Sequence, residues 1–374
     1  MDDPAVVAPP YLAPPFRLHE FSALRLAPGR VGDPASARAF ARPYRSVVKR
    51  LQEWERRGHV GRDRVPAVYL HEYSAGGLTV RGLVGGLDLA RRAPDVAAST
   101  VIPHEGVHAG QARELASRMA QMGMNPAPIL MVHRGGGAVG RILAERLEEP
   151  ADHSYDDRAG QRHRLWALTD SDLRARVSES LRETRALLAD GHHRYAAYLE
   201  LQERFPGTGW DRGLVMLVDQ DETPLHLGAI HRVLPGADVA TIAGAAVDAG
   251  FGARPATRTR ALEQLGRATP VAGSGDDWRV LDLQVGPDDL AVCLLHDRII
   301  PRLPAEARVV THHHSAQEAI AAAEATGGTA LLVPAVEFDV VVARSAAGRL
   351  LPEKATSFQP KPSVGVLMRS PLDE

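Results

Sequence analysis

One short stretch limits the possible folds of this chain more than any other. The apolar run "RALLADG" at residues 185–191 ends in an Asp-Gly pair and is followed by "HHRYAAYLELQERF" at residues 192–205. Asp-Gly favours a tight turn, and the residues after it are mostly good helix formers. We therefore predict a helix that ends near Thr184, a strand through Ala189, a turn, and a new helix over residues 192–205.

The apolar spacing before this motif also fits one uninterrupted helix that reaches Gly191, so both interpretations stay open. Elsewhere, short β-rich runs alternate with helical stretches. "PAVYLHEYS" and "LTVRGLVGGL" flank Ala75-Gly76-Gly77 and predict a hairpin. "GLVMLVDQDETPLHLGAIHRVL" predicts a second hairpin, with residues 219–222 at its tip. The mixture predicts an α+β fold of mixed sheets with flanking helices.

A chain of 374 residues can form two domains, or one large one. The composition changes near residue 236, where Ala-rich helical stretches begin. We expect an N-terminal α/β region over residues 1–235 and a C-terminal α/β region over residues 236–374, packed together as one catalytic unit.

Composition and charge exclude several classes of protein. The formal net charge is −2, so no overall basic surface attracts nucleic acid or anionic membranes. The single cysteine, Cys293, excludes an intramolecular disulfide and disfavours a Cys-based zinc site. No apolar run reaches the length of a membrane span, and the start "MDDPAVVAPP" is unlike a signal peptide. We expect a cytoplasmic protein, with a homo-oligomer compatible with the sequence.

The Asp-Gly motif carries the first candidate site. The N–H groups at a helix start precede the intrahelical hydrogen bonds, and the helix dipole is positive there, so an anion is attracted. Gly191 lets a ligand approach the backbone, and His192, His193 and Arg194 add donors. Asp190 could cap the helix, orient a histidine or bind a metal ion. The alternative is a plain Asp-Gly turn with solvated basic residues.

A second candidate is "HEGVH" at residues 104–108, which matches the H-E-x-x-H pattern of zinc hydrolases. That pattern needs both histidines on one helix face. Here Pro103 precedes the pattern, Gly106 interrupts it, and the helical pattern starts only at residue 109. We therefore favour a loop that carries His104 and Glu105 into a cleft.

A glycine run at residues 135–137 follows an apolar strand without a clear helix start, and is only a weak phosphate-loop signal.

Lysine is rare in this chain. Only Lys49, Lys354 and Lys361 occur, and two of them lie in "LPEKATSFQPKPSVG". A lysine ammonium is a compact point charge that suits a single phosphate oxygen or an ion pair. This segment is expected to be a loop leading into a final strand, with Lys354, Thr356, Ser357 and Lys361 available to a cleft. The alternative is that this segment is a proline-stiffened crossover connection whose lysines are ordinary surface residues.

The strand "GAIHRVL" places His231 beside Arg232. Side chains alternate along a strand, so one of the two should face the core of the sheet and the other solvent or a cleft. Such a pair more often forms a structural network than a site. The histidine run "THHHSAQEA" precedes a helix, with Ser315 as its expected N-cap.

Several of these segments together resemble a known family. "IPHE" at 102–105, "ADGHHRYAAYLELQ" at 189–202, "HRV" at 231–233 and "LPEKATSFQPKPSVGVL" at 351–367 occur in the order seen in the family called domain of unknown function 1015 (DUF1015). "FSALRLAP" resembles the opening segment of that family. The resemblance extends over nearly the whole chain.

A more distant similarity concerns the turn alone. "ADGHHRYAA" resembles the strand–Gly–x–x–Arg–helix element of the ParB/sulfiredoxin group, which includes free serine kinases and in which this turn holds nucleotide phosphates. The resemblance implies a ParB/sulfiredoxin-like core element, with phosphates at Gly191, His192, His193 and Arg194. The cysteine of sulfiredoxin has no counterpart in the motif.

These observations favour a nucleotide-dependent phosphotransferase that acts on a small hydroxyl-bearing metabolite, with ATP or ADP and Mg²⁺ as cofactors. The residues assigned are, for catalysis, Glu105, Asp190 and His193; for nucleotide binding, Gly191, His192, His193, Arg194, Lys354 and Lys361; for Mg²⁺, Asp190 and Glu105; and for substrate, His104, His231, Arg232, Thr356 and Ser357. A non-catalytic nucleotide or metabolite sensor is one alternative. A metal-dependent hydrolase using His104, Glu105 and His108 is another.

Overall fold

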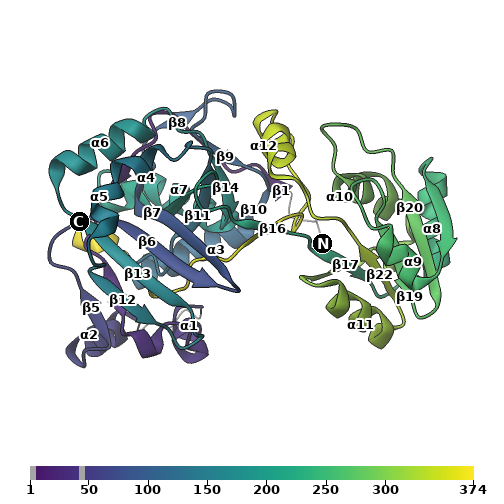
Figure 1. Cartoon of the computed structure of the whole chain (residues 1–374), viewed down its shortest axis with the longest axis horizontal. Helices are drawn as coiled ribbons and strands as arrows, with labels where there is room; N and C mark the ends of the chain where they lie inside the picture. Colours follow the sequence, from purple (N-terminus) through teal and green to yellow (C-terminus); the bar gives the residue numbers. More distant parts are fainter. Residues whose placement is uncertain (1–5, 42–46) are drawn as a thin grey trace. The chain divides into compact units, whose positions relative to one another are not determined.

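The chain forms two compact units in the computed structural model, which describes residues 6–41 and 47–374. Unit 1 comprises Met1–Leu225 and Pro360–Glu374, and unit 2 comprises His226–Gln359. The end of the chain, yellow in Figure 1, therefore returns to the purple and teal elements of unit 1. The division differs from the one expected at residue 235, because residues of the final segment pair with unit 1: Met368 pairs with Leu24 and Arg369 with Asn125.

Unit 1 is built on a nine-stranded mixed sheet. Its strands, in sheet order, are β12 (His153–Asp156), β13 (Arg162–Leu168), β6 (Val68–Ala75), β7 (Leu78–Asp88), β15 (Arg212–Asp219), β11 (Ile129–His133), β14 (Ala186–Asp190) and β9 (Val101–Pro103), with β3 (Leu18–His19) paired to β7. The β11/β15 and β14/β9 pairs are parallel. All five residues of β11 are buried, as expected for an apolar run in a central strand.

Helices and short strand pairs complete unit 1. The helices are α1 (Pro34–Ala41), α2 (Val47–Arg56), α3 (Ala109–Met122), α4 (Ala138–Ile142), α5 (Ala144–Glu148), α6 (Ser171–Leu181) and α7 (His192–Arg204). The short pairs are β1 (Val6–Val7) with β10 (Val107–His108), β2 (Tyr11–Leu12) with β8 (Arg92–Ala93), and β4 (Leu24–Leu26) with β5 (Val60–Arg62). Helices α3 and α7 pack against each other.

The structure confirms one predicted hairpin and corrects the other. Strands β6 and β7 are joined by Gly76 and Gly77, both at positive φ, as a tight two-residue hairpin turn requires. The second hairpin, over residues 213–234, is wrong. Strand β15 pairs with β7 and β11, so both of its edges are occupied by strands distant in sequence. The unit boundary falls inside the expected hairpin.

Unit 2 has a six-stranded antiparallel sheet with helices on both faces. Its strands, in sheet order, are β18 (Gly252–Ala256), β20 (Asp277–Asp282), β19 (Val271–Ser274), β22 (Thr329–Leu332), β17 (His231–Leu234) and β21 (Thr311–His313), and β16 (His226–Gly228) pairs separately with β23 (Ser357–Gln359). Its helices are α8 (Val239–Asp248), α9 (Arg258–Glu263), α10 (Ala291–Leu294), α11 (Ala316–Thr326) and α12 (Phe338–Ala346).

The alternation along β22 divides the core of unit 2 into two layers. Leu331 packs in a cluster with Ile242 of α8, whereas Leu332 packs in another with Ile320 of α11. Ser315 caps α11 by accepting a hydrogen bond from the Glu318 N–H, as predicted. The mixed sheets with flanking helices confirm the α+β fold class.

The last residues of the chain are held in unit 1 by hydrogen bonds of Arg369. The Arg369 side chain is fully buried. Its Nη1 donates to the Arg212 carbonyl at 2.7 Å and to Asn125 Oδ1 at 3.2 Å, and its Nε donates to Glu374 at 2.8 Å. A charged group buried this completely is tolerated because its donors are satisfied.

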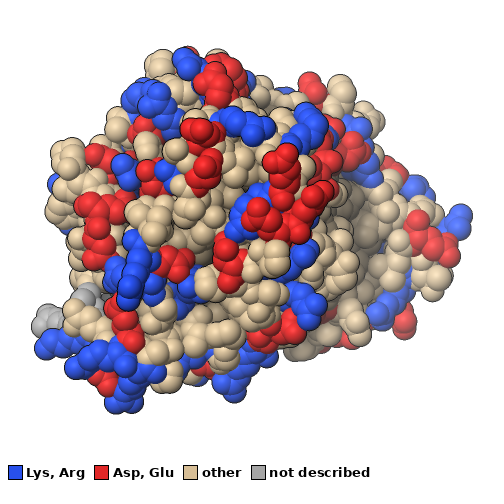
Figure 2. Space-filling view, turned by 60° about the vertical axis from the view of Figure 1, so that its left-hand side comes forward, with Lys and Arg blue, Asp and Glu red and all other residues tan. Residues whose placement is uncertain are grey.

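Figure 2 shows acidic and basic side chains interspersed over the face that it presents. No helix within residues 6–41 and 47–374 is long and apolar enough to cross a membrane.

Candidate functional site

The predicted strand–turn–helix is confirmed. Strand β14 ends at Asp190, Gly191 occupies the turn, and α7 begins at His192. Gly191 has φ +94° and ψ 32°, a left-handed conformation that favours glycine. A Cβ atom at this position would also lie 2.8 Å from Ile129 Cγ2. Glycine is therefore required here both by backbone conformation and by space.

The start of α7 faces the turn with its positive dipole end. The first intrahelical hydrogen bond runs from the Tyr195 N–H to the Gly191 carbonyl, at 2.8 Å. The N–H groups of His192, His193 and Arg194 precede that ladder. Glycine at the N-cap has no side chain with which to cap them. The local geometry is the kind that attracts an anion.

The two adjacent histidines of α7 hold the loop between β9 and β10. The backbone N–H groups of His104 and Glu105 both donate to His192 Nε2, each at 3.3 Å. The backbone N–H of His108 donates to His193 Nε2 at 3.1 Å. A ring nitrogen that accepts carries a lone pair, so in the neutral rings the proton resides on Nδ1. The pair of histidines therefore attaches the "HEGVH" loop to the helix start.

His104 is oriented from the opposite side. Its Nδ1 lies 2.7 Å from the Leu188 carbonyl oxygen, which can only accept, so Nδ1 carries the proton and Nε2 carries the lone pair. Burial lowers the pKa of His104 to about 4, although the Leu188 carbonyl and Asp190 oppose the shift. The ring is therefore neutral at physiological pH. Glu105 Oε1 lies 3.8 Å from His104 Nε2.

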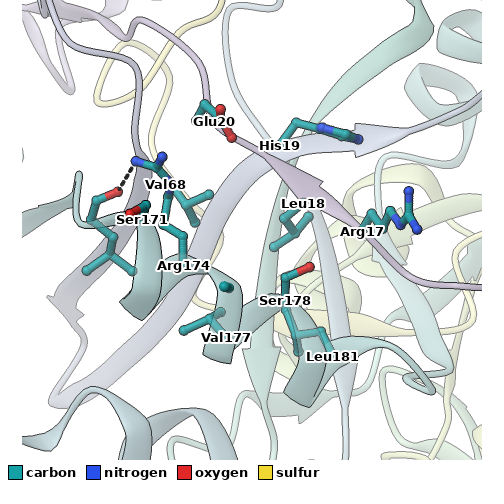
Figure 3. A pocket seen from close by; sticks show the side chains of 12 residues that line it. Arg17, Leu18, His19, Glu20, Val68, Ser171, Arg174, Val177, Ser178 and Leu181 are labelled. Atoms are coloured by element: carbon teal, nitrogen blue, oxygen red, sulfur yellow. Dashed lines mark hydrogen bonds between the residues drawn. The ribbon is translucent and has the colours of Figure 1, made fainter.

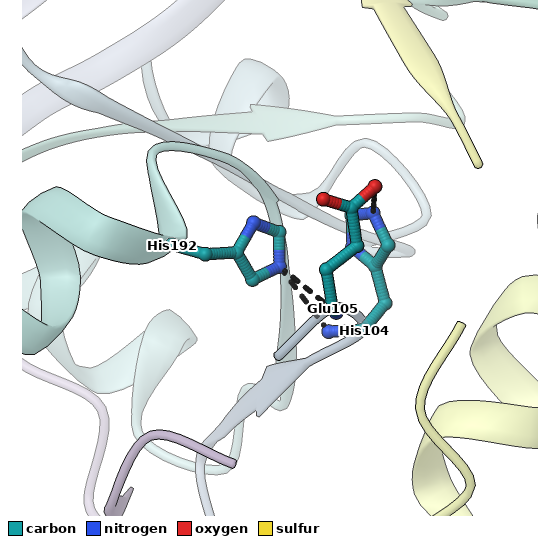
Figure 4. A group of neighbouring side chains, drawn as sticks. All are labelled: His104, Glu105 and His192. Atoms are coloured by element: carbon teal, nitrogen blue, oxygen red, sulfur yellow. Dashed lines mark hydrogen bonds and ion pairs between the residues drawn. The ribbon is translucent and has the colours of Figure 1, made fainter. Parts of the chain in front are cut away.

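His104, Glu105 and His192 form a group whose possible ligand atoms all lie within 4.8 Å of one another (Figure 4). Two imidazole nitrogens and a carboxylate suit a transition metal ion. A metal on His192 Nε2 would compete with the two backbone N–H groups that donate to it. His108 is outside this group and stacks on His193, with ring centroids 5.9 Å apart. His104 and His108 lie on a loop and a short strand, so they do not share the helix face that H-E-x-x-H requires.

Asp190 is held by two cations. Its Oδ2 accepts a hydrogen bond from Arg194 Nη2 at 2.8 Å, and its Oδ1 contacts Lys361 Nζ. Burial alone would raise the pKa of Asp190, but Arg194 and Lys361 outweigh it, and the pKa lies below the ordinary value. Arg194 also donates to the Pro128 carbonyl at 3.1 Å. Asp190 is thus an ionised anchor for two cations and is poorly suited to act as a general base.

Lys361 reaches this site because the chain returns to unit 1 just before it. The buried Tyr73 hydroxyl donates to the Pro360 carbonyl at 2.7 Å, and Ser363 Oγ donates to Gln161 at 2.9 Å. These contacts were missed by sequence reasoning, since the partners are distant along the chain and a lone tyrosine gives no signal. They place Lys361 at the carboxylate that precedes Gly191.

The remaining predicted residues belong to unit 2. Both His231 and Arg232 are buried, in contrast to the expectation that one side chain would face solvent or a cleft. His231 Nδ1 accepts the Val333 N–H at 3.2 Å. Arg232 Nε donates to His296 Nε2 at 3.2 Å, and burial and Arg232 lower the pKa of His296 to about 3. Both sides of strand β17 are covered, which explains the double burial.

The other three unit 2 residues differ in exposure. Thr356 and Ser357 are buried, and Ser357 Oγ lies 3.3 Å from His314 Nδ1. Lys354 is exposed and has φ +58°, an unusual backbone conformation for a residue with a side chain. The predicted site residues thus fall into two groups, one in each unit.

The glycine run at residues 135–137 holds carboxylates. Gly135 and Gly137 donate their N–H groups to the buried Asp219 carboxylate, at 2.9 Å each, and Gly136 donates to Asp221 at 3.0 Å. These N–H groups are therefore already engaged, and a phosphate-loop role is unsupported.

The fold and the site define an α+β protein with a glycine-turn site at a helix start. The chain belongs to the family described as "Protein of unknown function (DUF1015)", which matches residues 12–260. It matches no curated protein.

Three solved structures show similarity to the chain. A mutant free serine kinase in complex with AMP has 12% identity and a TM-score of 0.42, covering 79% of this chain and 93% of that one. SbnI with a C-terminal truncation, from Staphylococcus aureus, has 11% identity and a TM-score of 0.45, covering 78% and 88%. A conserved hypothetical protein from Pyrococcus furiosus has 13% identity and a TM-score of 0.38, covering 71% and 92%. These values are too low to transfer a ligand or an activity.

Proposed function

We propose that unit 1 binds the phosphates of ATP or ADP, with Mg²⁺, at the start of α7 and transfers a phosphoryl group to a small hydroxyl-bearing metabolite. The observation that supports this most directly is the ion pair between Lys361 and Asp190, which are 171 residues apart. It joins the two most distinctive sequence motifs at one glycine turn.

The charges at the turn favour an anion. Arg194 and Lys361 supply two cations around the single carboxylate of Asp190, and the helix dipole adds positive charge at the same end. The Lys361 side chain is 44% exposed, so its ammonium is accessible to a ligand while it contacts Asp190. Phosphoryl transfer requires this kind of positioning and charge neutralisation more than covalent chemistry.

Glu105 and His104 are the groups assigned to the acceptor. In the proposed step the acceptor hydroxyl oxygen forms a bond to the terminal phosphorus, the bond from that phosphorus to the bridging oxygen breaks, and the hydroxyl proton passes to Glu105. The lone pair of the neutral His104 Nε2 can accept a hydrogen bond from a polar N–H or O–H group of the metabolite. His192 and His193 position the loop that carries both residues. Mg²⁺, when bound with the nucleotide, would neutralise phosphate charge, and Glu105 is the carboxylate proposed to hold it.

Calorimetric titration with Mg-ATP and Mg-ADP tests the binding half of the proposal. We expect Lys361→Ala to weaken nucleotide binding at least tenfold, because a charge-assisted contact contributes about 1.5–3 kcal/mol. Lys49→Ala is a matched control, since it removes the same charge from α2, outside the site. The proposal fails if wild type binds neither nucleotide, or if both variants bind as wild type does.

Turnover distinguishes an enzyme from a sensor. Purified protein would be incubated with Mg-ATP or Mg-ADP and a panel of hydroxyl-bearing amino acids and polyols, with phosphorylated product measured. We expect Glu105→Gln to lower turnover at saturating Mg-nucleotide by about a hundredfold or more, as for loss of a general base. Nucleotide binding without product from any acceptor would favour the non-catalytic sensor.

A further inference from the structure

A second cavity in unit 1 lies between α6 and residues 17–20, and none of the residues that line it belongs to the α7 site. Its volume is about 340 Å³, within the range of small-molecule sites. Figure 3 shows the side chains of α6 on one side of this cavity and those of residues 17–20 on the other. We call it the α6 cavity.

The α6 cavity has an apolar floor and a polar rim. The floor includes Val68, Leu168, Val177 and Leu181, all buried. The rim includes the exposed hydroxyls Ser171 and Ser178, together with Arg17, Arg174, His19 and Glu20. Two arginines against one glutamate leave an excess of positive charge at the rim. Apolar surface beside a few charged and polar groups is typical of sites for small amphipathic molecules.

Arg174 is fixed in place by the protein. Its Nη1 donates to the Thr169 carbonyl at 2.7 Å and to the Leu168 carbonyl at 3.4 Å. The dashed line in Figure 3 marks the second of these hydrogen bonds. A guanidinium has five N–H donors in a planar fork. An arginine held through one nitrogen keeps the geometry to bind a carboxylate with the others, at low entropic cost.

We propose that the α6 cavity binds a small amphipathic carboxylate, with its carboxylate at Arg174 and its short apolar chain over Val68, Leu168 and Val177. This site is independent of the phosphotransferase proposal, since the two share no residue. Burial of several methylenes on the floor and a charge-assisted contact at the rim are both needed for useful affinity.

Calorimetric titration of the full chain with hexanoate, 1-hexanol and hexylamine tests the proposal. We expect hexanoate to bind at least tenfold more tightly than the alcohol, and the amine to bind more weakly still. Arg174→Gln should remove this preference. Arg176→Gln is the matched control, because it removes the same charge two positions along α6 and does not line the cavity. Equal binding of acid and alcohol, or no binding of hexanoate by wild type, would overturn the proposal.

A second variant covers the case in which Arg174→Gln does not fold. Ser178→Phe places a ring at the rim from an exposed helix position, so it should reduce hexanoate affinity at least tenfold with an unchanged thermal unfolding temperature. Hexanoate should also raise the Tm of wild type, as a ligand that binds only the folded state does. Unaltered hexanoate binding in Ser178→Phe would show that the acid binds elsewhere, and the proposal would then be wrong.

Discussion

Replacing Gly191 with alanine tests whether the turn between β14 and α7 requires glycine. The residue has φ +94°, and a left-handed conformation costs a residue with a side chain about 1–2 kcal/mol. The new methyl group would also lie 2.8 Å from Ile129 Cγ2, and Ile129 is fully buried. Overpacking of a core costs about 1–3 kcal/mol. We therefore expect Gly191→Ala to lower the free energy of unfolding by about 2–5 kcal/mol.

Urea unfolding followed by tryptophan fluorescence measures this loss, because three of the four tryptophans, Trp54, Trp166 and Trp210, lie in unit 1. Gly207→Ala is the matched control. Gly207 follows α7 and has φ +75°, but no heavy atom lies within 4 Å of an added Cβ, so only the backbone cost of about 1–2 kcal/mol applies. Equal losses in the two variants would refute the packing argument.

Four further predictions concern the same unit. Because the pKa of Asp190 is lowered, its stabilising effect is present at neutral pH and is lost as the pH falls below 3.8 and through the folded-state pKa; Asp190→Asn should cost about 1–3 kcal/mol at pH 7 and much less near pH 3, and an equal cost at both would contradict this. The imidazole NMR signals of His104 should not titrate between about pH 8 and pH 5.5, since burial lowers its pKa to about 4; a midpoint near 6.5 would contradict the burial of the ring. Asp219→Ala should lower the free energy of unfolding by about 2–4 kcal/mol, because three backbone N–H groups lose a buried carboxylate; a loss below 1 kcal/mol would argue against that network. Dialysis against EDTA should leave the Tm unchanged, because backbone N–H groups engage the lone pair of His192; a large fall in Tm with release of stoichiometric zinc would show the opposite.

The local parts of this structure could be predicted from the sequence. The turn at Gly191 and the start of α7 follow from an Asp-Gly pair before a helix-forming run, and both signals depend on neighbours in the chain. The hairpin at Gly76-Gly77 follows in the same way, since two glycines permit positive φ at both central positions. The cap at Ser315 is likewise local.

The parts that were missed depend on partners distant in sequence. Strand β15 resembles one arm of a hairpin, but its hydrogen bonds go to β7 and β11, and no local signal identifies them. The same holds for the contact of Lys361 with Asp190, since the scarcity of lysine singles out Lys361 without indicating its partner. Nothing in the sequence indicates that the rings of His192 and His193 accept hydrogen bonds from backbone N–H groups of the "HEGVH" loop.

The return of residues 360–374 to unit 1 has a consequence for how the chain folds during synthesis. Unit 2 is continuous, so all of its residues have left the ribosome before the final segment emerges. Unit 1 is interrupted by unit 2: Arg369, Pro360 and Lys361 supply contacts inside unit 1 that cannot form until all of unit 2 has been synthesised. The N-terminal part of the chain, which in most multidomain proteins folds first, here lacks the contacts of Arg369 and Lys361 until that later segment is available. Any activity of the α7 site that depends on Lys361 therefore requires that the whole of unit 2 be synthesised first.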